Sequence, residues 1–507
     1  MFPRAWQELR AIAVSLVLML IGVAVASAQV ATLTLEEAIA IARRSNPDYL
    51  TRQEDASRAD WAVRAAYGAL LPGVSASSSL SWQDAGTPRF GIFNASDFGF
   101  GTTTSYYSSS YSLGLNYRLS GAALLAPGRE KASRRAAEAS IAAAASLLDA
   151  NVTRTYLAVL RARDGIVLAR AELVRAEENL RLAEARVAVG TAIPLEQTQA
   201  EVERGRAEVA LLQAQNLQQT EQLRLTQILG IRLDGDVQLT TGFQVSAVPW
   251  TMDELVTLAI EANPDLVAAR ATVSSTDASV RMAKSAYLPS LSMQAGFSGF
   301  TRQAGNEDYL VDQARSSLES QRANCELFNG ISAGLSRPLA GRPANCAPFA
   351  LTPDAESAIR SGNDVFPFDF SREPLSVSLT LSLPIFEGFG REQQIEEARV
   401  AARTADYRLR GEELRIRTEV GTAYLNVATA RQSVDLEARN RDLADEQLRL
   451  ARERYAVGVA NFIELQDAET IKARGDRAYL NAMYAYHEGL ASLEAAVGRS
   501  LRATENR

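Results

Sequence analysis

Side chains that could carry out chemistry are scarce in this sequence of 507 residues. It contains one histidine, His487, and two cysteines, Cys325 and Cys346, which excludes most zinc sites, histidine-based triads and iron–sulfur clusters. His487 lies in a helical segment rich in alanine and tyrosine, with no second histidine or cysteine nearby, which favours a structural role. No Gly-x-x-x-x-Gly-Lys-Ser/Thr loop occurs. We therefore expect no enzyme and no cofactor or metal.

Carboxylates are the remaining candidates for a functional site. The 60 acidic residues outnumber the 53 basic ones, and the net charge of −7 excludes a polybasic nucleic-acid binder. Most of the carboxylates fall in predicted long helices, where they form solvated faces and pairs four residues apart. Glu464 and Asp467 are three residues apart, which makes them neighbours on one helical face.

The N-terminus indicates the compartment. Arg4 and Arg10 precede an apolar run at 11–25, and Ala26-Ser27-Ala28 supplies a cleavage site, so residues 1–28 are predicted to be a secretory signal peptide. The alternative, a membrane-spanning anchor, is disfavoured because the run is short and ends in small residues. Later in the chain no run of roughly 18 apolar residues occurs. The sequence thus predicts an exported protein that enters a membrane, if at all, as strands.

The chain is a tandem duplication. Asn46-Pro47-Asp48 recurs as Asn263-Pro264-Asp265, a shift of 217 residues, and Leu180–Ala183 recurs as Leu448–Ala451, a shift of 268. The second copy therefore holds about 51 extra residues, which fall at 301–372, where periodicity fades. The predicted organisation is a signal peptide at 1–28, a first repeat at 29–245, a second repeat at 246–500 and a tail at 501–507.

Strands and long helices alternate within each repeat. Hydrophobic and polar residues alternate with a period of two at about 73–83, 109–119, 289–299 and 374–386. Each stretch has about the length that a tilted strand needs to cross a bilayer. The alternative is a soluble sandwich with one face in water. Small hydroxyl residues on the polar side suit a water-filled lumen better than the charged surface of such a protein. Four strands are too few to close a barrel, and lipid does not tolerate an open edge, so several chains must pool strands, eight from a dimer or twelve from a trimer.

The remaining sequence is predicted to be helical. From about 128 to 189, bulky residues and mostly alanine alternate along a heptad seam that includes Val152, Val159 and Leu180, and the second repeat keeps the register at Val420 and Val427. A helix of this length measures roughly 93 Å, which greatly exceeds a bilayer and belongs in an aqueous space. Shorter helical patterns occupy about 34–68, 192–230, 251–285 and 460–498.

The duplicated order helix–strand–strand–long helix–helix, preceded by a signal peptide, resembles the TolC-type outer membrane efflux protein family. The local signatures are Asn46-Pro47, Asn263-Pro264, Leu381–Gly388, Val189-Gly190-Thr191 and Tyr455–Gly458. The first copy departs from the pattern, because Arg118 stands near the place where the second has Pro384. The resemblance covers nearly the whole chain after the signal peptide, apart from the 301–372 insert.

The resemblance implies a mainly α fold with a membrane β-barrel portion. Three copies would form a homotrimeric α/β barrel, with 12 strands in the outer membrane lipid and 12 coiled helices in the periplasm. The function implied is passive: the exit duct of a tripartite efflux or type I secretion system, which docks onto an inner-membrane pump through a periplasmic adaptor (membrane fusion) protein. The alternative is a trimeric surface adhesin, whose four strands are contiguous at the C-terminus, whereas here they form two separated pairs.

The resemblance also implies site residues at the ends of the long helices. Contact with the adaptor is expected at Val189, Gly190, Thr191, Val457, Gly458 and Val459. Tyr455, Glu464 and Asp467 occupy positions that constrict the periplasmic aperture in this family, and Glu196 is the first-repeat counterpart of Glu464. The arginine that partners these residues in the family is absent, since Ala460 stands at its place. Three copies of each carboxylate would form a negative ring that favours cations.

The two cysteines lie in the extra loop of an exported chain, where oxidation is expected. We predict a disulfide between Cys325 and Cys346, which closes a loop of about 20 residues and contributes about 3 kcal/mol to its order. Two free thiols are the alternative.

Overall fold

The computed structural model divides into two compact units. It describes residues 32–86, 89–90, 93–94, 103–232, 238–247, 249–337, 341, 343 and 345–501. The predicted signal peptide and residues 502–507 of the predicted tail lie outside these ranges. The helical unit contains residues up to 63, 128–280 and those from 396 onward, and the strand unit contains 64–127 and 281–395. Each unit draws segments from both sequence repeats.

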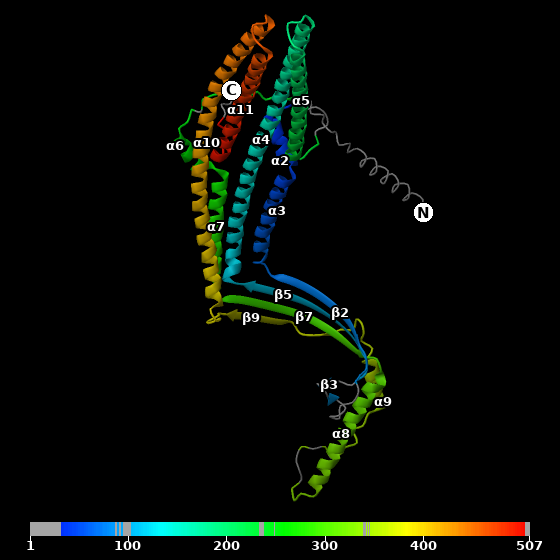
Figure 1. The fold of residues 1–507 in the computed structure, drawn as a ribbon. Coiled ribbons are helices and arrows are strands. Elements are labelled where there is room, and N and C mark those ends of the chain that lie inside the picture. The colour runs from blue at the N-terminus through cyan, green and yellow to red at the C-terminus, as the bar shows by residue number, and fades with distance from the viewer. Residues whose placement is uncertain are drawn as a thin grey trace, which may run out of the picture. The chain divides into compact units, whose positions relative to one another are not determined.

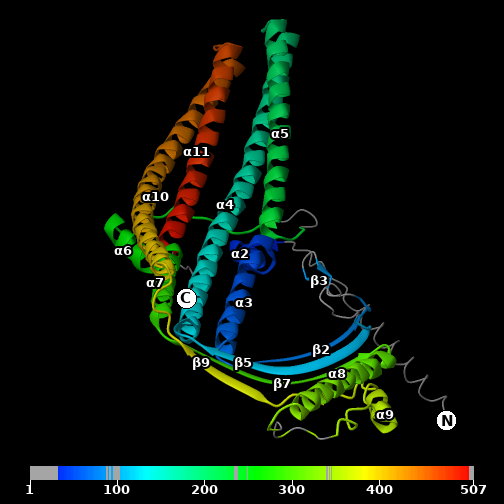
Figure 2. The same cartoon turned by 90° about the horizontal axis from the view of Figure 1, so that it is seen from below.

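The helical elements come in two matching sets (Figures 1 and 2). The first set is α2 (Leu35–Ser45), α3 (Pro47–Gly68), α4 (Gly121–Ala188) and α5 (Pro194–Leu229). The second set is α6 (Met252–Ala262), α7 (Pro264–Lys284), α10 (Gly390–Ala456) and α11 (Phe462–Val497), with a short 3-10 turn at Ser285–Tyr287. The patterns at 34–68 and 251–285 are thus two helices each. The cause is the Asn-Pro pair, because a proline lacks the amide hydrogen and pushes the residue before it out of the helical region.

The two long helices extend further than the heptad seam predicts. Helix α4 has 68 residues and α10 has 67, so each is about 100 Å long. Helix α4 begins at Gly121 rather than near 128, and Pro127 lies inside its second turn. A side chain at Gly121 would lie 2.7 Å from the carbonyl oxygen of Ser285, so only glycine fits there. The seam residues Val152, Val159, Leu180, Val420 and Val427 are buried, which confirms the helical face predicted from the heptads.

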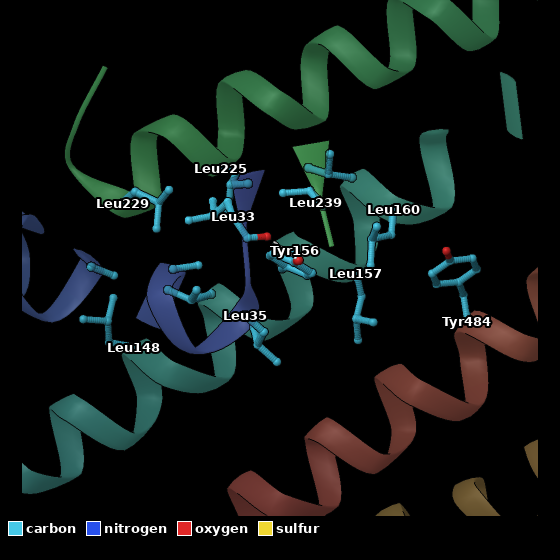
Figure 3. Packing of buried hydrophobic residues seen from close by; sticks show 14 residues of the cluster. Leu33, Leu35, Leu148, Tyr156, Leu157, Leu160, Leu225, Leu229, Leu239 and Tyr484 are labelled. Carbon is cyan, nitrogen blue, oxygen red and sulfur yellow. Dashed lines mark hydrogen bonds between the residues drawn. The ribbon is translucent and has the colours of Figure 1, made fainter. Parts of the chain in front are cut away.

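Two apolar clusters hold the base of the helical unit, one for each repeat. In the first, Leu33, Tyr156, Leu225 and Leu229 point toward one another, and the hydroxyl of Tyr156 donates a hydrogen bond to the carbonyl of Leu33 at 2.8 Å (Figure 3). Two short strands, β1 (Thr32–Leu33) and β6 (Gln238–Leu239), pair in parallel beside it. The second cluster contains Leu255, Leu266, Ile416, Val420, Tyr486 and Leu493.

Each repeat closes on itself through an asparagine. The side-chain amide of Asn46 donates to the carbonyl of Ile228 at 2.8 Å, and that of Asn263 donates to the carbonyl of Ala496 at 2.8 Å. Both asparagines are buried. The last helix of a repeat is therefore tied to the break between its first two helices, which gives the repeated Asn-Pro motif a structural reason.

A glycine makes each closure sterically feasible. Gly230 and Gly498 end α5 and α11 in the left-handed region, with φ of 69° and 82°. A Cβ at Gly230 would lie 2.2 Å from the carbonyl oxygen of Ser45, and one at Gly498 would lie 2.7 Å from the ring of Pro264. The close approach and the positive φ both require glycine.

The strand unit is an antiparallel sheet in the order β2-β5-β7-β9. Its strands are β2 (Gly73–Gln83), β5 (Tyr106–Leu119), β7 (Ser290–Ala304) and β9 (Ser376–Ser382). The two-residue strand β8 (Ser371–Arg372) also pairs with β7, and β3 (Arg89–Phe90) pairs with β4 (Phe93–Asn94). Both terminal strands of the four-stranded order, β2 and β9, are exposed along their whole length.

The register separates an apolar face from a polar one. Val74 lies opposite Leu115, Leu113 opposite Phe297 and Met293 opposite Leu379, so the hydrophobic residues of all four strands share one face. On the other face serine hydroxyls pair across β2 and β5 at 2.8 Å, Ser77 with Ser112 and Ser79 with Ser110. Since side chains alternate along a strand, the sequence pattern fixes both faces.

The strand ends and the insert differ from the sequence expectation. β5 begins at Tyr106 and β7 continues to Ala304, past the predicted 109 and 299. β9 stops at Ser382, before Pro384, which has no amide hydrogen to donate. The 301–372 insert contains two helices, α8 (Glu307–Ala333) and α9 (Pro353–Ser361). Arg360 of α9 pairs with Asp308 of α8 at 2.6 Å.

A disulfide joins Cys325 and Cys346 within this insert, which is the pairing expected from the sequence.

Among the residues that the structure describes, no helix has the length and apolar character needed to span a membrane.

Candidate functional site

The candidate site lies where the long helices of the helical unit turn back. The turns from α4 to α5 and from α10 to α11 are at the same end of the unit (Figure 1). Gly190 and Gly458 adopt left-handed φ values of 73° and 80° there. Thr191 donates its amide to the carbonyl of Arg186 at 2.9 Å, and Val459 does the same to Arg454 at 2.9 Å. Both glycines thus end their helices as left-handed caps.

Aliphatic side chains stand in solvent at both turns. Val189 and Val457 are each 74% exposed. The exposed set also includes Ile193, Leu195, Val459 and Ile463. No atom lies within 4 Å of the position that a Cβ would take at Gly190 or Gly458. The two turns therefore present an open, uncharged surface made from both repeats.

Tyr455 links the two hairpins just below their turns. It is fully buried, and its hydroxyl donates a hydrogen bond to the carboxylate of Glu196 on α5 at 2.9 Å. Arg186 of α4 lies over its ring, with the guanidinium carbon 4.2 Å from the centroid, and donates to the backbone carbonyl of Tyr455 at 2.9 Å. The ring of Phe462 meets it edge-on at 5.9 Å. The structure thus brings together Tyr455 and Glu196, two of the residues that the sequence singled out.

The surroundings of Tyr455 keep its hydroxyl protonated. Burial, followed by the hydrogen bond to Glu196, raises the pKa of Tyr455 to about 12. The tyrosine is therefore a neutral donor and Glu196 is the acceptor at physiological pH. Ala460 is buried in the same apolar cluster as Tyr455.

The structure places Glu464 and Asp467 apart from this contact. Glu464 is in the first turn of α11, and Arg454 at the end of α10 pairs with it at 2.5 Å. Its backbone amide is capped by the side chain of Asn461 at 2.9 Å. Asp467 is exposed and pairs with no cation among the described residues. Asp467 thus remains a solvated carboxylate in a single chain.

Arg186 and Arg454 are the site residues that the sequence analysis missed. The signal was present, because the shift of 268 residues that relates the two repeats also maps Arg186 onto Arg454. The same shift maps Val187 onto Tyr455, so only the second repeat supplies a tyrosine. The cationic groups at this end of the helices therefore come from a duplicated position and not from position 460.

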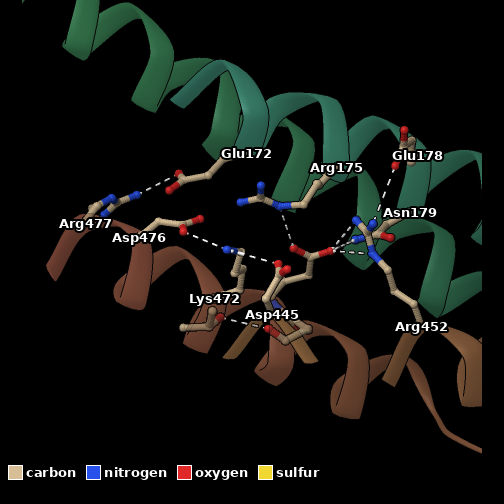
Figure 4. A network of polar contacts seen from close by, with 12 residues as sticks. Glu172, Arg175, Glu178, Asn179, Asp445, Arg452, Lys472, Asp476 and Arg477 are labelled. Atoms are coloured by element: carbon tan, nitrogen blue, oxygen red, sulfur yellow. Dashed lines mark hydrogen bonds and ion pairs between the residues drawn. The ribbon is translucent and has the colours of Figure 1, made fainter. Parts of the chain in front are cut away.

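A layer of charged side chains joins the hairpins further from the turns (Figure 4). Glu469 of α11 accepts hydrogen bonds from Arg175 at 3.1 Å and Asn179 at 2.9 Å, both on α4, and from Arg452 of α10 at 2.8 Å. Arg477 pairs with Glu172 at 2.8 Å. Ion pairs and charged hydrogen bonds make the cross-hairpin contact in this layer, whereas at Tyr455 an aromatic ring also takes part in it.

A second polar group and a cavity accompany this layer. Lys472 bridges Asp445 at 3.1 Å and Asp476 at 2.8 Å. A cavity of about 280 Å³ opens between α4, α5 and α11, and its lining includes Glu203 and Gln466, which are hydrogen-bonded at 2.6 Å. The arrangement holds helices together through polar bonds and offers no nucleophile paired with a base.

Comparison with known families identifies the class. The family model described as outer membrane efflux protein matches residues 38–231 and 355–499. The chain therefore belongs to the outer membrane efflux protein family, a family of transport ducts and not of enzymes. It is accordingly an outer membrane exit duct whose helical body lies in the periplasm. A search of curated proteins gives no match.

Solved structures support the fold at low sequence identity. The VceC outer membrane protein of Vibrio cholerae matches with a TM-score of 0.66 and 16% identity over 92% of this chain and 97% of that one. The CmeC outer membrane channel of Campylobacter jejuni gives 0.68 and 16% over 92% and 85%. The open-state MtrE channel of Neisseria gonorrhoeae gives 0.65 and 19% over 92% and 89%.

Proposed function

We propose that three copies of this chain assemble into one duct, in which their sheets pool into a single twelve-stranded barrel. The observation that carries the proposal is the sheet itself, which ends on two exposed strands, β2 and β9. Their outer backbone groups need partners, because lipid leaves an unpaired edge unsatisfied. One face of the sheet is mainly apolar and the other is lined by hydroxyls, as lipid and a water-filled lumen require.

The number of strands supports several chains. Membrane barrels have about eight strands or more, whereas each chain supplies four. Pairing of β2 of one chain with β9 of the next would close the sheet. The family resemblance favours three chains over two.

The mass of the assembly tests this proposal. Light scattering of the detergent-extracted protein, corrected for bound detergent, should give three times the mass of the processed chain. A dimeric mass would mean that the barrel has eight strands instead of twelve. A monomeric mass in a preparation that still forms channels in planar bilayers would contradict the pooled barrel altogether.

A trimeric surface adhesin was the alternative. The strand pair β2–β5 is separated along the chain from the pair β7–β9 by α4, α5, α6 and α7. Two further helices, α10 and α11, follow β9. An adhesin anchor would place its strands together at the C-terminus, with the helical body outside the cell. The strand positions and the family membership both favour the duct.

The helix turns are proposed to dock a periplasmic adaptor, which connects the duct to an inner-membrane pump. The support is the exposed aliphatic surface around Gly190 and Gly458, where the described residues leave the space beside each glycine open. Replacing either glycine with aspartate places a charge in this surface without a clash. We expect assembled trimers that no longer support export.

A matched control separates charge from backbone strain. Asparagine has the shape of aspartate, tolerates the left-handed region and is neutral. Gly190→Asn and Gly458→Asn should therefore keep most of the export that Gly190→Asp and Gly458→Asp lose. Export unchanged in both aspartate variants would exclude adaptor contact at these turns, and equal loss in the asparagine variants would assign the effect to the backbone.

The same end of the helices is proposed to be the gate. Glu196 and Glu464 lie in the first turns of α5 and α11, Asp467 lies in the second turn of α11, and Tyr455 lies near the end of α10. The Tyr455–Glu196 bond connects one hairpin to the other, so it supports a closed end. Threefold repetition would bring three copies of Glu464 and Asp467 together as a cation-selective ring.

A further inference from the structure

A segment of the strand unit lies across the apolar face of its own sheet. Residues 363–372, called the strap here, lead from α9 into β8. The side chain of Asn363 bonds both backbone groups of Ala304, accepting from the amide at 2.7 Å and donating to the carbonyl at 2.9 Å. The amide of Phe366 donates to the side chain of Gln303 at 3.0 Å. These bonds fix the strap to the end of β7 that is remote from α7.

The strap covers a polar spot on that face. The hydroxyls of Ser109 and Thr301 are 2.7 Å apart, and both residues are buried on a face that is mainly hydrophobic. The Ser109 hydroxyl also donates to the carbonyl of Pro367 at 2.6 Å. Because an unsatisfied hydroxyl is costly in an apolar medium, this contact makes the face compatible with lipid up to the level of the strap.

Aromatic rings seat the strap on the sheet. Phe366 packs on Tyr107 with centroids 5.6 Å apart, and Phe370 meets Tyr111 edge-on at 4.8 Å. Tyr111 lies over Gly299, where a Cβ would be 2.5 Å from its ring, so the glycine makes room for the pair. Phe366 and Phe370 therefore extend the apolar face rather than cross to the hydroxyl face.

The exposed residues of the strap include an aromatic ring and a cation, together with the carboxylates of Asp364 and Asp369. Phe368 is 81% exposed. Arg372 lies opposite Gly299 and hence on the same face, and it makes no ion pair within the described ranges of the chain. Aromatic rings and long cationic side chains collect at the boundary between acyl chains and headgroups.

The height of the strap above the other end of the sheet agrees with the thickness of the apolar part of a bilayer. The part of β5 from Leu119 to Tyr107 is about 40 Å long at the usual rise per residue. A strand tilt of about 40° reduces this to a height of about 30 Å, close to the apolar band of a membrane barrel with its flanking girdle. The strap crosses β5 at Tyr107 and Ser109, which is the upper limit of that band.

We propose that the strap is a lipid-binding surface at the headgroup boundary of the outer leaflet. Phe368 enters the acyl boundary, and Arg372 meets the anionic phosphate of a headgroup. Lipid is the occupant because Phe366, Phe368 and Phe370 of the strap extend the hydrophobic side of the sheet. This inference rests on the proposed function, in which that face is turned toward the membrane.

Spin labelling of the whole protein in vesicles tests the inference. The native cysteines are joined in a disulfide, so a nitroxide on Phe368→Cys labels one position. The protein is placed in vesicles of phosphatidylethanolamine and phosphatidylglycerol. Collision of the label with oxygen then reports exposure to lipid, and collision with a nickel chelate reports exposure to water. The references are Leu379→Cys on the apolar face of β9 and Ser320→Cys, an exposed position of α8. We expect an oxygen-to-nickel ratio at position 368 several-fold above that at 320.

The two reference positions distinguish failure of lipid binding by the strap from failure of the proposed function. A label at 368 that matches 320, while that at 379 is in the bilayer, overturns the strap and leaves the proposed function standing. A label at 379 that is itself in water overturns both. A label at 368 inaccessible to both reagents means protein contact and also overturns lipid binding. Arg372→Glu should shift the label at 368 toward the nickel chelate, whereas Arg372→Lys should not.

Discussion

Replacing Tyr455 with phenylalanine should weaken the closed state of the proposed gate. The change removes one hydroxyl, whose hydrogen bond to Glu196 spans 2.9 Å and joins α10 to α5. The ring remains available to Arg186 and to the edge of Phe462, so packing at the site is kept. The variant thus isolates one polar contact between the hairpins.

The magnitude follows from the environment of that bond. A hydrogen bond to a charged acceptor contributes about 1.5–3 kcal/mol, and Glu196 is partly exposed, which reduces this to about 1–2 kcal/mol. If the bond exists only in the closed state, its loss raises the ratio of open to closed by a factor of about 5–30 in each chain. Because free energies add, concerted opening of three chains would multiply these factors.

Single-channel recording in planar bilayers measures this ratio as the open probability. Tyr407→Phe is a matched control, since Tyr407 lies on the same helix and is 72% exposed. Combining Tyr455→Phe with Glu196→Ala should add little to either change alone, because both remove the same bond. An open probability equal to that of the wild type in Tyr455→Phe, or full additivity in the double variant, would refute a latch at this bond.

Three further outcomes are expected. Denatured, unreduced protein should take up no thiol label, and reduction should expose the loop between Cys325 and Cys346 to protease; two labelled cysteines before reduction would contradict the disulfide. The double change Glu464→Ala with Asp467→Ala should lower cation selectivity and block by trivalent cations, and unchanged values for both would exclude a carboxylate ring. Because the pKa of Tyr455 is raised, its protonated hydroxyl stabilises the closed state fully below about pH 10. This stabilisation is lost as the pH rises toward about 12, so the open probability should increase over the same range.

Local sequence patterns were enough to place most elements. The period-two alternation located the strands and their two faces, and the heptads located the buried seam of α4 and α10. The ends of the elements were less predictable. β7 continues to Ala304 because Asn363, distant in sequence, supplies bonds to its last residue. No local pattern contains that information.

The candidate site shows the same limit. Glu196 and Tyr455 are separated by 259 positions in sequence, and only the folded hairpins bring them to hydrogen-bonding distance. Arg186 was accessible through the internal repeat but carries no pattern of its own, because a lone arginine in a charged helix resembles any solvated residue. The helices α8 and α9 were missed since the insert lacks strong periodicity.

The closures at Asn46 and Asn263 make each hairpin a lever. The bases of α5 and α11 are held by buried asparagine bonds and by glycines that pack closely against the chain at Ser45 and Pro264. From there each helix extends for 36 residues, or about 54 Å, toward its turn. A rotation of about 5° at the base would displace the turn by about 5 Å, a full helical pitch. Small angular play at a rigid pivot is therefore enough to break a bond such as that of Tyr455, without unfolding any helix.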